Sequence, residues 1–348
     1  MKEKTKLKFH KLTAGIAKAY NTSDTRTYFT AEPTIEQTLV DKIVESADFL
    51  QKINVLTPDE KSGEKILGSA SGMLAKRTNT NDRDRQPLNP LSLGSKGYEC
   101  HKTEFDYFIK YETIDAWAKF KDFANRFLNW TRHQTALSQI MVGWYGESIA
   151  IETDPETNTN GEDVNKGWLQ KLREYEMDGV VTQVITEGAE GSGVVRIGKD
   201  GDYENLDAAV HDCLQLLHDV HRERDDLVAI IGRDLLALDK SQLYVAQGET
   251  PSEKERIENQ RVTRTYGGLP AQSETFFPSR GIWVGPLSNL SMYIQSGSIR
   301  QKIEDNAKRD RVEHYHSMNV DYVVEDEQAC AMIEFKNVQL PDGSGGWA

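Results

Sequence analysis

Cysteine is scarce in this chain of 348 residues. Cys100, Cys213 and Cys330 lie far apart, form no CxxC pair and have no histidine at the spacing of a zinc site. An odd number of scattered thiols argues against a disulfide framework and is typical of a protein made in a reducing compartment. The apolar residues around each cysteine favour a position in the core.

Long hydrophobic runs are absent as well. No stretch approaches the ~20 apolar residues that a membrane-spanning helix needs. The first 20 residues are basic, but they lack the apolar centre of a signal peptide. We therefore expect a soluble protein that is cytoplasmic when it is synthesised.

The chain has no surplus of positive charge. Its 55 acidic residues outnumber the 42 lysines and arginines, which gives a formal net charge of −13. Proteins that bind nucleic acid by neutralising phosphates need more basic residues than acidic ones. The composition therefore argues against general nucleic-acid binding. It is compatible with a container that encloses a polyanion without adhering to it.

Catalytic motifs are also missing. The sequence contains no GxSxG, no HExxH and no complete phosphate-binding glycine loop. Two histidine pairs, His314 with His316 and His218 with His221, have no third ligand at a telling distance. We therefore expect no catalytic, cofactor or metal site, and a protein that is not an enzyme.

The most regular stretch is residues 112–146, where large apolar residues recur at steps of three and four. This spacing places a stripe along one face of an α-helix. Thr113 can cap its start, and no proline interrupts it before Gly146. The stripe consists of Trp117, Phe120, Phe127, Trp130, Leu137, Met141 and Trp144, with Ala124 and Gln134 between them.

The length of this predicted helix bears on the shape of the subunit. At ~1.5 Å per residue it would be roughly 50 Å long. A compact chain of this size would have a radius of gyration of about 20 Å. The helix therefore favours a flat or elongated subunit built on a spine, although a long helix inside an ordinary helical domain stays open.

The first 29 residues form a basic arm. They carry seven lysines and arginines and two acidic residues, for a net charge of +5. A weak apolar stripe indicates a short amphipathic helix, and residues 21–30 are predicted to be a polar linker. Such an arm could bind a membrane, DNA or a protein partner, or it could be a solvated tail.

Residues 65–74 and 98–112 are predicted to be extended and to flank a long polar stretch. The second segment alternates apolar and polar residues, as a β-strand does. Together they indicate an outsized β-hairpin, whose loop is either functional or disordered because ordinary connections are shorter. The tip carries charges of both signs that would suit salt bridges to a neighbouring chain or simple solvation: Arg77, Asp82, Arg83, Asp84 and Arg85.

A polar connector at residues 153–167 marks a domain boundary. Beyond it we predict an α/β unit, with a helix over residues 204–220 and a buried strand at 227–231 that leads into another helix. Later apolar residues predict antiparallel strands packed against the spine: Trp283, Val284, Leu290, Met292, Ile294, Val320, Tyr322, Val324, Ala331, Ile333 and Phe335. The last residues are expected to be frayed.

Ten segments, taken jointly and in order, carry a specific resemblance that spans nearly the whole chain. They are FTAEPTIEQTL (29–39), ESADFLQKINV (45–55), GEKI (63–66), KGYEC (96–100), KGWLQK (166–171), VRIGKDGDYENLDAAV (195–210), DLVAIIGRDLL (226–236), GGLPA (267–271), LSNLSMY (287–293) and DRVEHYHSMNVDYVVED (310–326). In this order they resemble the major capsid proteins of contractile-tailed temperate bacteriophages of the Peduovirus type. No single segment is a chemical fingerprint.

The resemblance implies an α+β fold, the Hong Kong 97-type capsid fold. This fold has an N-terminal arm, an extended β-hairpin loop, a peripheral domain with a long spine helix and an axial α/β domain. The implied division is an arm at residues 1–55 (1–29 a maturation propeptide), the extended loop at 56–111, the peripheral spine at 112–164, the axial domain at 165–295, peripheral strands at 296–338 and a flexible tail at 339–348.

The resemblance also implies a function. The chain would be a structural major capsid protein that assembles as hexamers and pentamers into an icosahedral phage head around double-stranded DNA, without sequence-specific binding. Its partners would be other copies, an internal scaffold, a maturation protease and a portal protein. It would assemble in the host cytoplasm and end in the virion, with no membrane involved.

The match around FTAEP places the implied maturation cleavage between Phe29 and Thr30. Two alternatives stay open. One is an encapsulin-like compartment of the same fold, and the other is a soluble enzyme whose site the motifs do not reveal.

Overall fold

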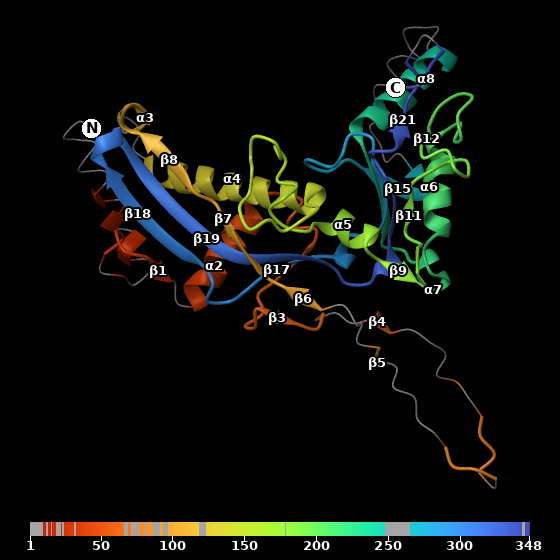
Figure 1. Ribbon diagram of the computed structural model, residues 1–348, viewed down its shortest axis with the longest axis horizontal. Coiled ribbons are helices and arrows are strands. Elements are labelled where there is room, and N and C mark those ends of the chain that lie inside the picture. The colour runs from red at the N-terminus through yellow and green to blue at the C-terminus, as the bar shows by residue number, and fades with distance from the viewer. Residues whose placement is uncertain are drawn as a thin grey trace.

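The computed structural model describes residues 10–11, 13–14, 16–18, 22, 24–30, 33–65, 69–70, 75, 77–80, 82–85, 91–92, 97–117, 123–177, 179–247, 265–342 and 345–348. These residues form two sheet-based bodies that stand side by side, with a hairpin that projects away from them (Figure 1). The arrangement is elongated, as the long spine predicted.

A seven-stranded sheet is organised around β19 (Arg311–Val324). One edge of β19 pairs in turn with β17 (Leu290–Ile294) and β18 (Arg300–Asn306), both antiparallel. Its other edge pairs with two further antiparallel strands. The remaining members are β7 (His101–Glu104), β8 (Tyr107–Lys110), β1 (Phe29–Thr30) beside β18, and β2 (Asn54–Leu56) beside β17.

The spine lies along this sheet as two described helices, α3 (Tyr111–Trp117) and α4 (Phe123–Tyr145) (Figure 1). Residues 118–122 between them lie outside the described residues, as do the side chains of Trp117, Phe120 and Ala124. The predicted helix is thus confirmed at both ends. A second helix, α2 (Pro33–Glu45), contacts α4.

The predicted apolar face of the spine is wrong in its middle. Trp130 is 44% exposed, and Leu137 and Met141 are only half-buried, whereas Trp144 is fully buried. The buried face has residues at steps of three and four, several of them smaller than those of the predicted stripe: Ala136, Gln139, Ile140, Gly143 and Trp144. Ala136 and Gly143 in particular let the helix approach its neighbours closely.

An aromatic cluster joins the spine to the rest of the core. The ring of Trp168, from α5 (Trp168–Arg173), makes edge contacts with Trp144 at 5.1 Å and with Tyr322 at 5.2 Å between centroids. Its indole Nε1 donates to the carbonyl oxygen of Ser291 at 2.9 Å, so this buried ring leaves no polar atom unpaired. Gly143 is required here, because a Cβ at that position would lie 2.2 Å from the Trp168 ring.

The second body contains a six-stranded sheet with helices on one face (Figure 1). The predicted buried strand and the helix after it are confirmed as β13 (Leu227–Ile231) and α8 (Arg233–Gln247). In spatial order the sheet comprises β11 (Val184–Ile185), β20 (Ala331–Ile333), β16 (Ile282–Pro286), β13, β15 (Leu269–Gln272) and β14 (Thr265–Tyr266).

The predicted helix over residues 204–220 is divided into α6 (Leu206–Gln215) and α7 (Asp219–Arg222). Asn205 caps α6 by accepting a hydrogen bond from the amide of Ala208 at 2.8 Å. Smaller elements complete the chain: β9 (Glu176–Met177), β10 (Val180–Val181), β12 (Val195–Arg196), β21 (Val338–Gln339), and the 3₁₀ turns Leu287–Asn289, Ala307–Arg309 and Glu327–Ala329.

Expectations about the last third of the chain need correction. β16 and β20 belong to the six-stranded sheet, where Val284, Ala331 and Ile333 pack in a separate core, whereas Trp283 shares the main core with Trp144 of the spine. β17 belongs to the seven-stranded sheet. The tail also folds back instead of fraying, because Leu340 and Ala348 exchange two backbone hydrogen bonds.

Candidate functional site: surfaces for assembly

Within the described part of the chain, no group of three or more His, Cys, Asp or Glu side chains could hold a metal ion. No helix there is long and apolar enough to cross a membrane. All three cysteines are buried, and burial raises the pKa of Cys100 to about 12, which keeps the thiol protonated and unreactive. Burial raises the pKa of the Cys213 and Cys330 thiols as well.

The two histidine pairs have structural roles. Burial lowers the pKa of His314 to about 3 and of His316 to about 4, so both are neutral side chains on β19. His218 caps α7 by accepting from the amide of Val220, and the Nε2 of His221 lies 3.2 Å from the carboxylate of Asp326. Neither pair gains a third ligand among the described residues.

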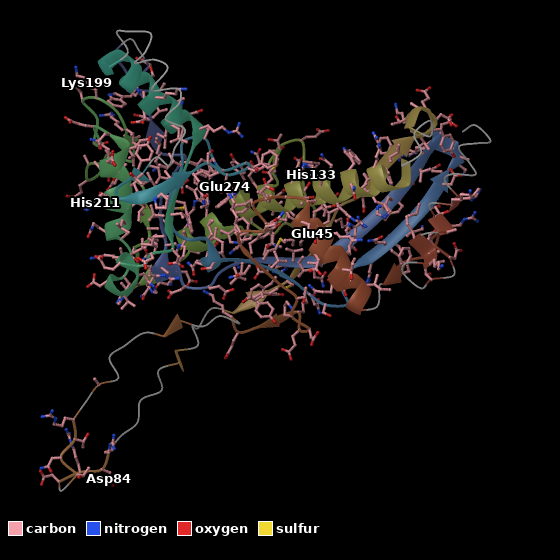
Figure 2. The ribbon with its side chains drawn as sticks, turned by 180° about the vertical axis from the view of Figure 1, so that it is seen from behind. Glu45, Asp84, His133, Lys199, His211 and Glu274 are labelled. Atoms are coloured by element: carbon pink, nitrogen blue, oxygen red, sulfur yellow. The ribbon has the colours of Figure 1, made fainter. Side chains whose placement is uncertain are left out.

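The projecting hairpin is confirmed in part: two short antiparallel strand pairs form it, but residues 101–110 of the predicted second strand pair with β19 of the seven-stranded sheet instead. β3 (Ser62–Gly63) pairs with β6 (Tyr98–Glu99), and farther out β4 (Ser69–Ala70) pairs with β5 (Leu91–Ser92). Asp84 lies at the far end, away from the rest of the subunit (Figure 2). Because the described tip side chains are exposed or half-exposed, the tip contributes little to the fold of its own subunit.

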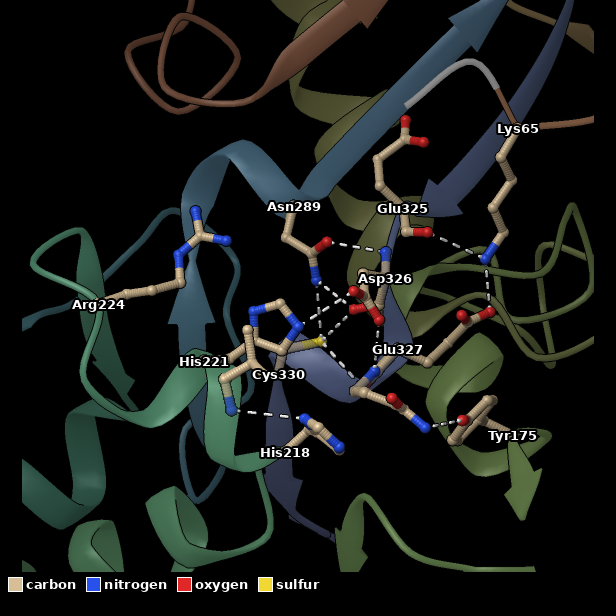
Figure 3. A network of polar contacts seen from close by, with 12 residues as sticks. Lys65, Tyr175, His218, His221, Arg224, Asn289, Glu325, Asp326, Glu327 and Cys330 are labelled. Carbon is tan, nitrogen blue, oxygen red and sulfur yellow. Dashed lines mark hydrogen bonds and ion pairs between the residues drawn. The ribbon is translucent and has the colours of Figure 1, made fainter. Parts of the chain in front are cut away.

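The base of the hairpin is fixed to the body by a buried ion pair. The Lys65 ammonium lies 2.6 Å from the carboxylate of Glu327, and their side chains are only 9% and 14% exposed. Lys65 also donates to the carbonyl oxygen of Glu325 at 3.4 Å (Figure 3). A buried pair of this kind costs several kcal/mol when one partner is removed.

The residues after Glu325 connect this base to both sheets. The amide of Asp326 donates to the side chain of Asn289 at 2.9 Å, and Asn289 Nδ2 donates back to the Asp326 carbonyl oxygen at 2.7 Å. The Asp326 carboxylate meets His221 of α7 (Figure 3). The sequence did not predict this junction. The run of three acidic residues from Glu325 to Glu327 was the only signal that could have indicated it.

The predicted cleavage residues, Phe29 and Thr30, form β1 at the edge of the seven-stranded sheet. Phe29 lies opposite Gln301, and Thr30 lies opposite Arg300. The Phe29 side chain is 8% exposed and belongs to a small apolar cluster with Ile16, Ile114, Ile303 and Val312. The segment predicted to be a polar linker, residues 21–30, therefore ends in a buried aromatic residue on a strand that is paired with the sheet.

Comparison with known proteins identifies the family. A family model described as "Phage major capsid protein, P2 family" matches residues 8–335. The capsid protein of Escherichia phage P2 is 39% identical over 339 residues, which is 96% of this chain and 95% of that protein. The major capsid protein of Serratia phage KSP20 is 32% identical over 321 residues, or 91% of each chain.

The fold agrees with a solved capsid assembly. A chain of the satellite phage P4 procapsid, which includes the size determination (Sid) protein, is 37% identical with a TM-score of 0.71. The match covers 87% of this chain and 99% of that one. It confirms the predicted α+β fold of the Hong Kong 97 type. The relatives are structural capsid proteins, so the chain is not an enzyme and an encapsulin-like role has weaker support. This chain belongs to the P2 family of phage major capsid proteins.

Proposed function

We propose that this major capsid protein, whose copies build the shell of a phage virion, assembles as hexamers and pentamers into an icosahedral head around double-stranded DNA. One observation carries the proposal. The hairpin projects from the body and holds exposed, oppositely charged side chains at its tip. Such a segment gains little stabilisation within its own subunit, so its contacts come from neighbouring copies.

The division of the chain supports this arrangement. We assign residues 1–55 to an arm, 56–111 to the extended loop, 112–164 and 296–338 to the peripheral domain, 165–295 to the axial domain, and 339–348 to the tail. β17 and β20 cross these limits, because each pairs with the sheet of the other domain. The two domains are thus interwoven through residues 282–333.

The arm carries the proposed maturation step. A protease cleaves between Phe29 and Thr30, assembly proceeds in the host cytoplasm on an internal scaffold, and the portal protein occupies one vertex. Removal of the first 29 residues changes the formal net charge from −13 to −18. A more negative shell wall repels packaged DNA, which keeps the genome mobile.

Co-expression with the scaffold tests assembly. Sedimentation and electron microscopy should find closed shells, and a chain that stays monomeric or forms only amorphous aggregate contradicts the proposal. N-terminal sequencing of subunits from mature particles tests the cleavage. A start at Thr30 is expected, and a start at Met1 or Lys2 refutes it.

A further inference from the structure

The proposed cleavage bond lies inside a paired strand. Both residues that flank it, Phe29 and Thr30, are in β1, whose backbone runs antiparallel to β18. The pairing continues upstream, because the amide of Ile303 donates to the carbonyl oxygen of Thr25 at 2.8 Å. The backbone on both sides of the bond is therefore tied to the edge of the sheet.

Two side chains of the same segment are buried. Phe29 is 8% and Thr25 is 7% exposed, whereas Tyr28 is 63% exposed and its ring centroid lies 5.8 Å from the ammonium of Lys302. Farther upstream, Ile16 packs into the cluster that holds Phe29. Residues before the cleavage bond thus contribute two of the five buried members of this cluster.

A protease needs the same backbone groups and the same side chain in order to bind this segment. Proteins that bind an extended peptide commonly do so with main-chain hydrogen bonds and with pockets for alternate side chains. In this subunit the backbone of the segment is paired with β18, and the Phe29 side chain is buried in the apolar cluster. The bond cannot enter a protease cleft while β1 is in place.

We propose that β1 shields the maturation bond, so that cleavage occurs only after residues 25–30 detach from β18. This inference rests on the proposed cleavage between Phe29 and Thr30. Detachment is a local event, because among the described residues β1 is a short strand opposite Arg300 and Gln301 of β18 and packs on a small cluster separate from the main cores. The position of this strand therefore sets when the subunit is cleaved.

A disulfide that holds the strand closed tests the shield. Tyr28 and Lys302 are suitable positions, since their side chains meet beside the bond and neither residue is Phe29 or Thr30. The Tyr28→Cys/Lys302→Cys variant adds two thiols to a chain whose own three are buried. Chymotrypsin is the probe, because it cuts after aromatic residues, and the fraction of chains that begin at Thr30 is measured by N-terminal sequencing.

The oxidised variant should be cut after Phe29 at least about tenfold more slowly than the same protein after reduction. The matched control, Glu304→Cys/Glu313→Cys, links β18 to β19 at opposed positions and leaves β1 free. Its cleavage should not respond to oxidation. Equal cleavage of the oxidised and reduced Tyr28→Cys/Lys302→Cys protein, with the disulfide verified by mass, overturns the proposal.

A second variant works in the opposite direction and needs no disulfide. Ile303→Ala removes buried atoms beneath Phe29 and should speed chymotrypsin cleavage after Phe29 by about tenfold. Cleavage at the wild-type rate contradicts the shield. The two proposals fail separately. Mature particles whose subunits begin at Met1 refute the cleavage. If subunits begin at Thr30 but the disulfide does not slow cleavage, the cleavage stands and the shielding by β1 is refuted.

Discussion

At the residue scale, one glycine carries a clear constraint. Gly143 lies in α4 directly against the Trp168 ring. In an exposed helix, replacing glycine by alanine stabilises by roughly 1 kcal/mol. Here the added methyl group would overlap the ring of a fully buried tryptophan whose other sides are packed, and interiors have few voids into which it could move.

We therefore predict that Gly143→Ala lowers the free energy of unfolding by about 1–3 kcal/mol. Urea denaturation followed by tryptophan fluorescence measures this. Ser138→Ala serves as the control, because Ser138 is exposed on the same helix and its change should be within about 0.5 kcal/mol. A stabilised Gly143→Ala protein would mean that the helix and the ring are farther apart.

The buried histidines of β19 predict a pH dependence of stability. The Nδ1 of His314 and the Nε2 of His316 are buried without a hydrogen-bond partner among the described residues. Burial lowers their pKa values from 6.5 to about 3 and about 4. The unfolded chain therefore takes up these protons at a higher pH than the folded chain does.

It follows that their contribution to stability is complete above about pH 6.5 and is lost as the pH falls toward 4. Each histidine contributes a slope of at most ~1.4 kcal/mol per pH unit in this window. Urea midpoints of the wild type and of His316→Phe, measured from pH 7.5 to 4.5, check this. The variant should show the shallower slope, and identical slopes would contradict the assignment.

Periodicity identified which spine residues share a face, but it could not identify what that face meets. Trp130 and Met141 line a groove of about 450 Å³ whose other wall includes residues 153–164. Phe127, a member of the predicted stripe, is only half-buried beside the small N-terminal cluster. The side of a helix that packs most closely can carry its smallest residues, so apolar size alone misassigns it.

At the element scale, the strands at residues 98–110 were predictable, although the pairing of residues 101–110 with β19 was not, and β1 was not predictable at all. The alternation of apolar and polar residues over residues 98–112 is long enough to indicate a strand. The two residues of β1 are too few to show any alternation. Its pairing with β18 joins residues more than 250 positions apart. The return of β20 to β16 and the junction at Asp326 likewise depend on partners that no local pattern specifies.

The hairpin also gives a prediction at this scale. Replacing residues 77–85 by a Gly-Ser segment of equal length should leave the far-UV circular dichroism and the melting temperature of the subunit unchanged, because the described side chains there are not buried. Shell formation in the presence of the scaffold should be lost.

Two results would contradict this prediction. Normal shells from the replaced protein would mean that the tip makes no contact that assembly needs. A subunit that fails to fold would mean that the tip is part of its core.

At the scale of the whole molecule, the sequence resemblance predicted the fold, and the structure shows how its parts are connected. Two sheets exchange strands through β17 and β20, and a buried ion pair fixes the hairpin base beside their junction. The hairpin base is therefore attached to the point where the two sheets meet. This attachment lets an exposed tip reach a neighbouring copy at a defined place.

Cryo-electron microscopy of shells assembled from this chain and its scaffold tests the central claim most directly. The account predicts an icosahedral particle of hexamers and pentamers in which each hairpin tip, around Asp84, contacts an adjacent copy. Particles without icosahedral symmetry, or shells whose hairpin tips extend freely into solvent, would contradict it.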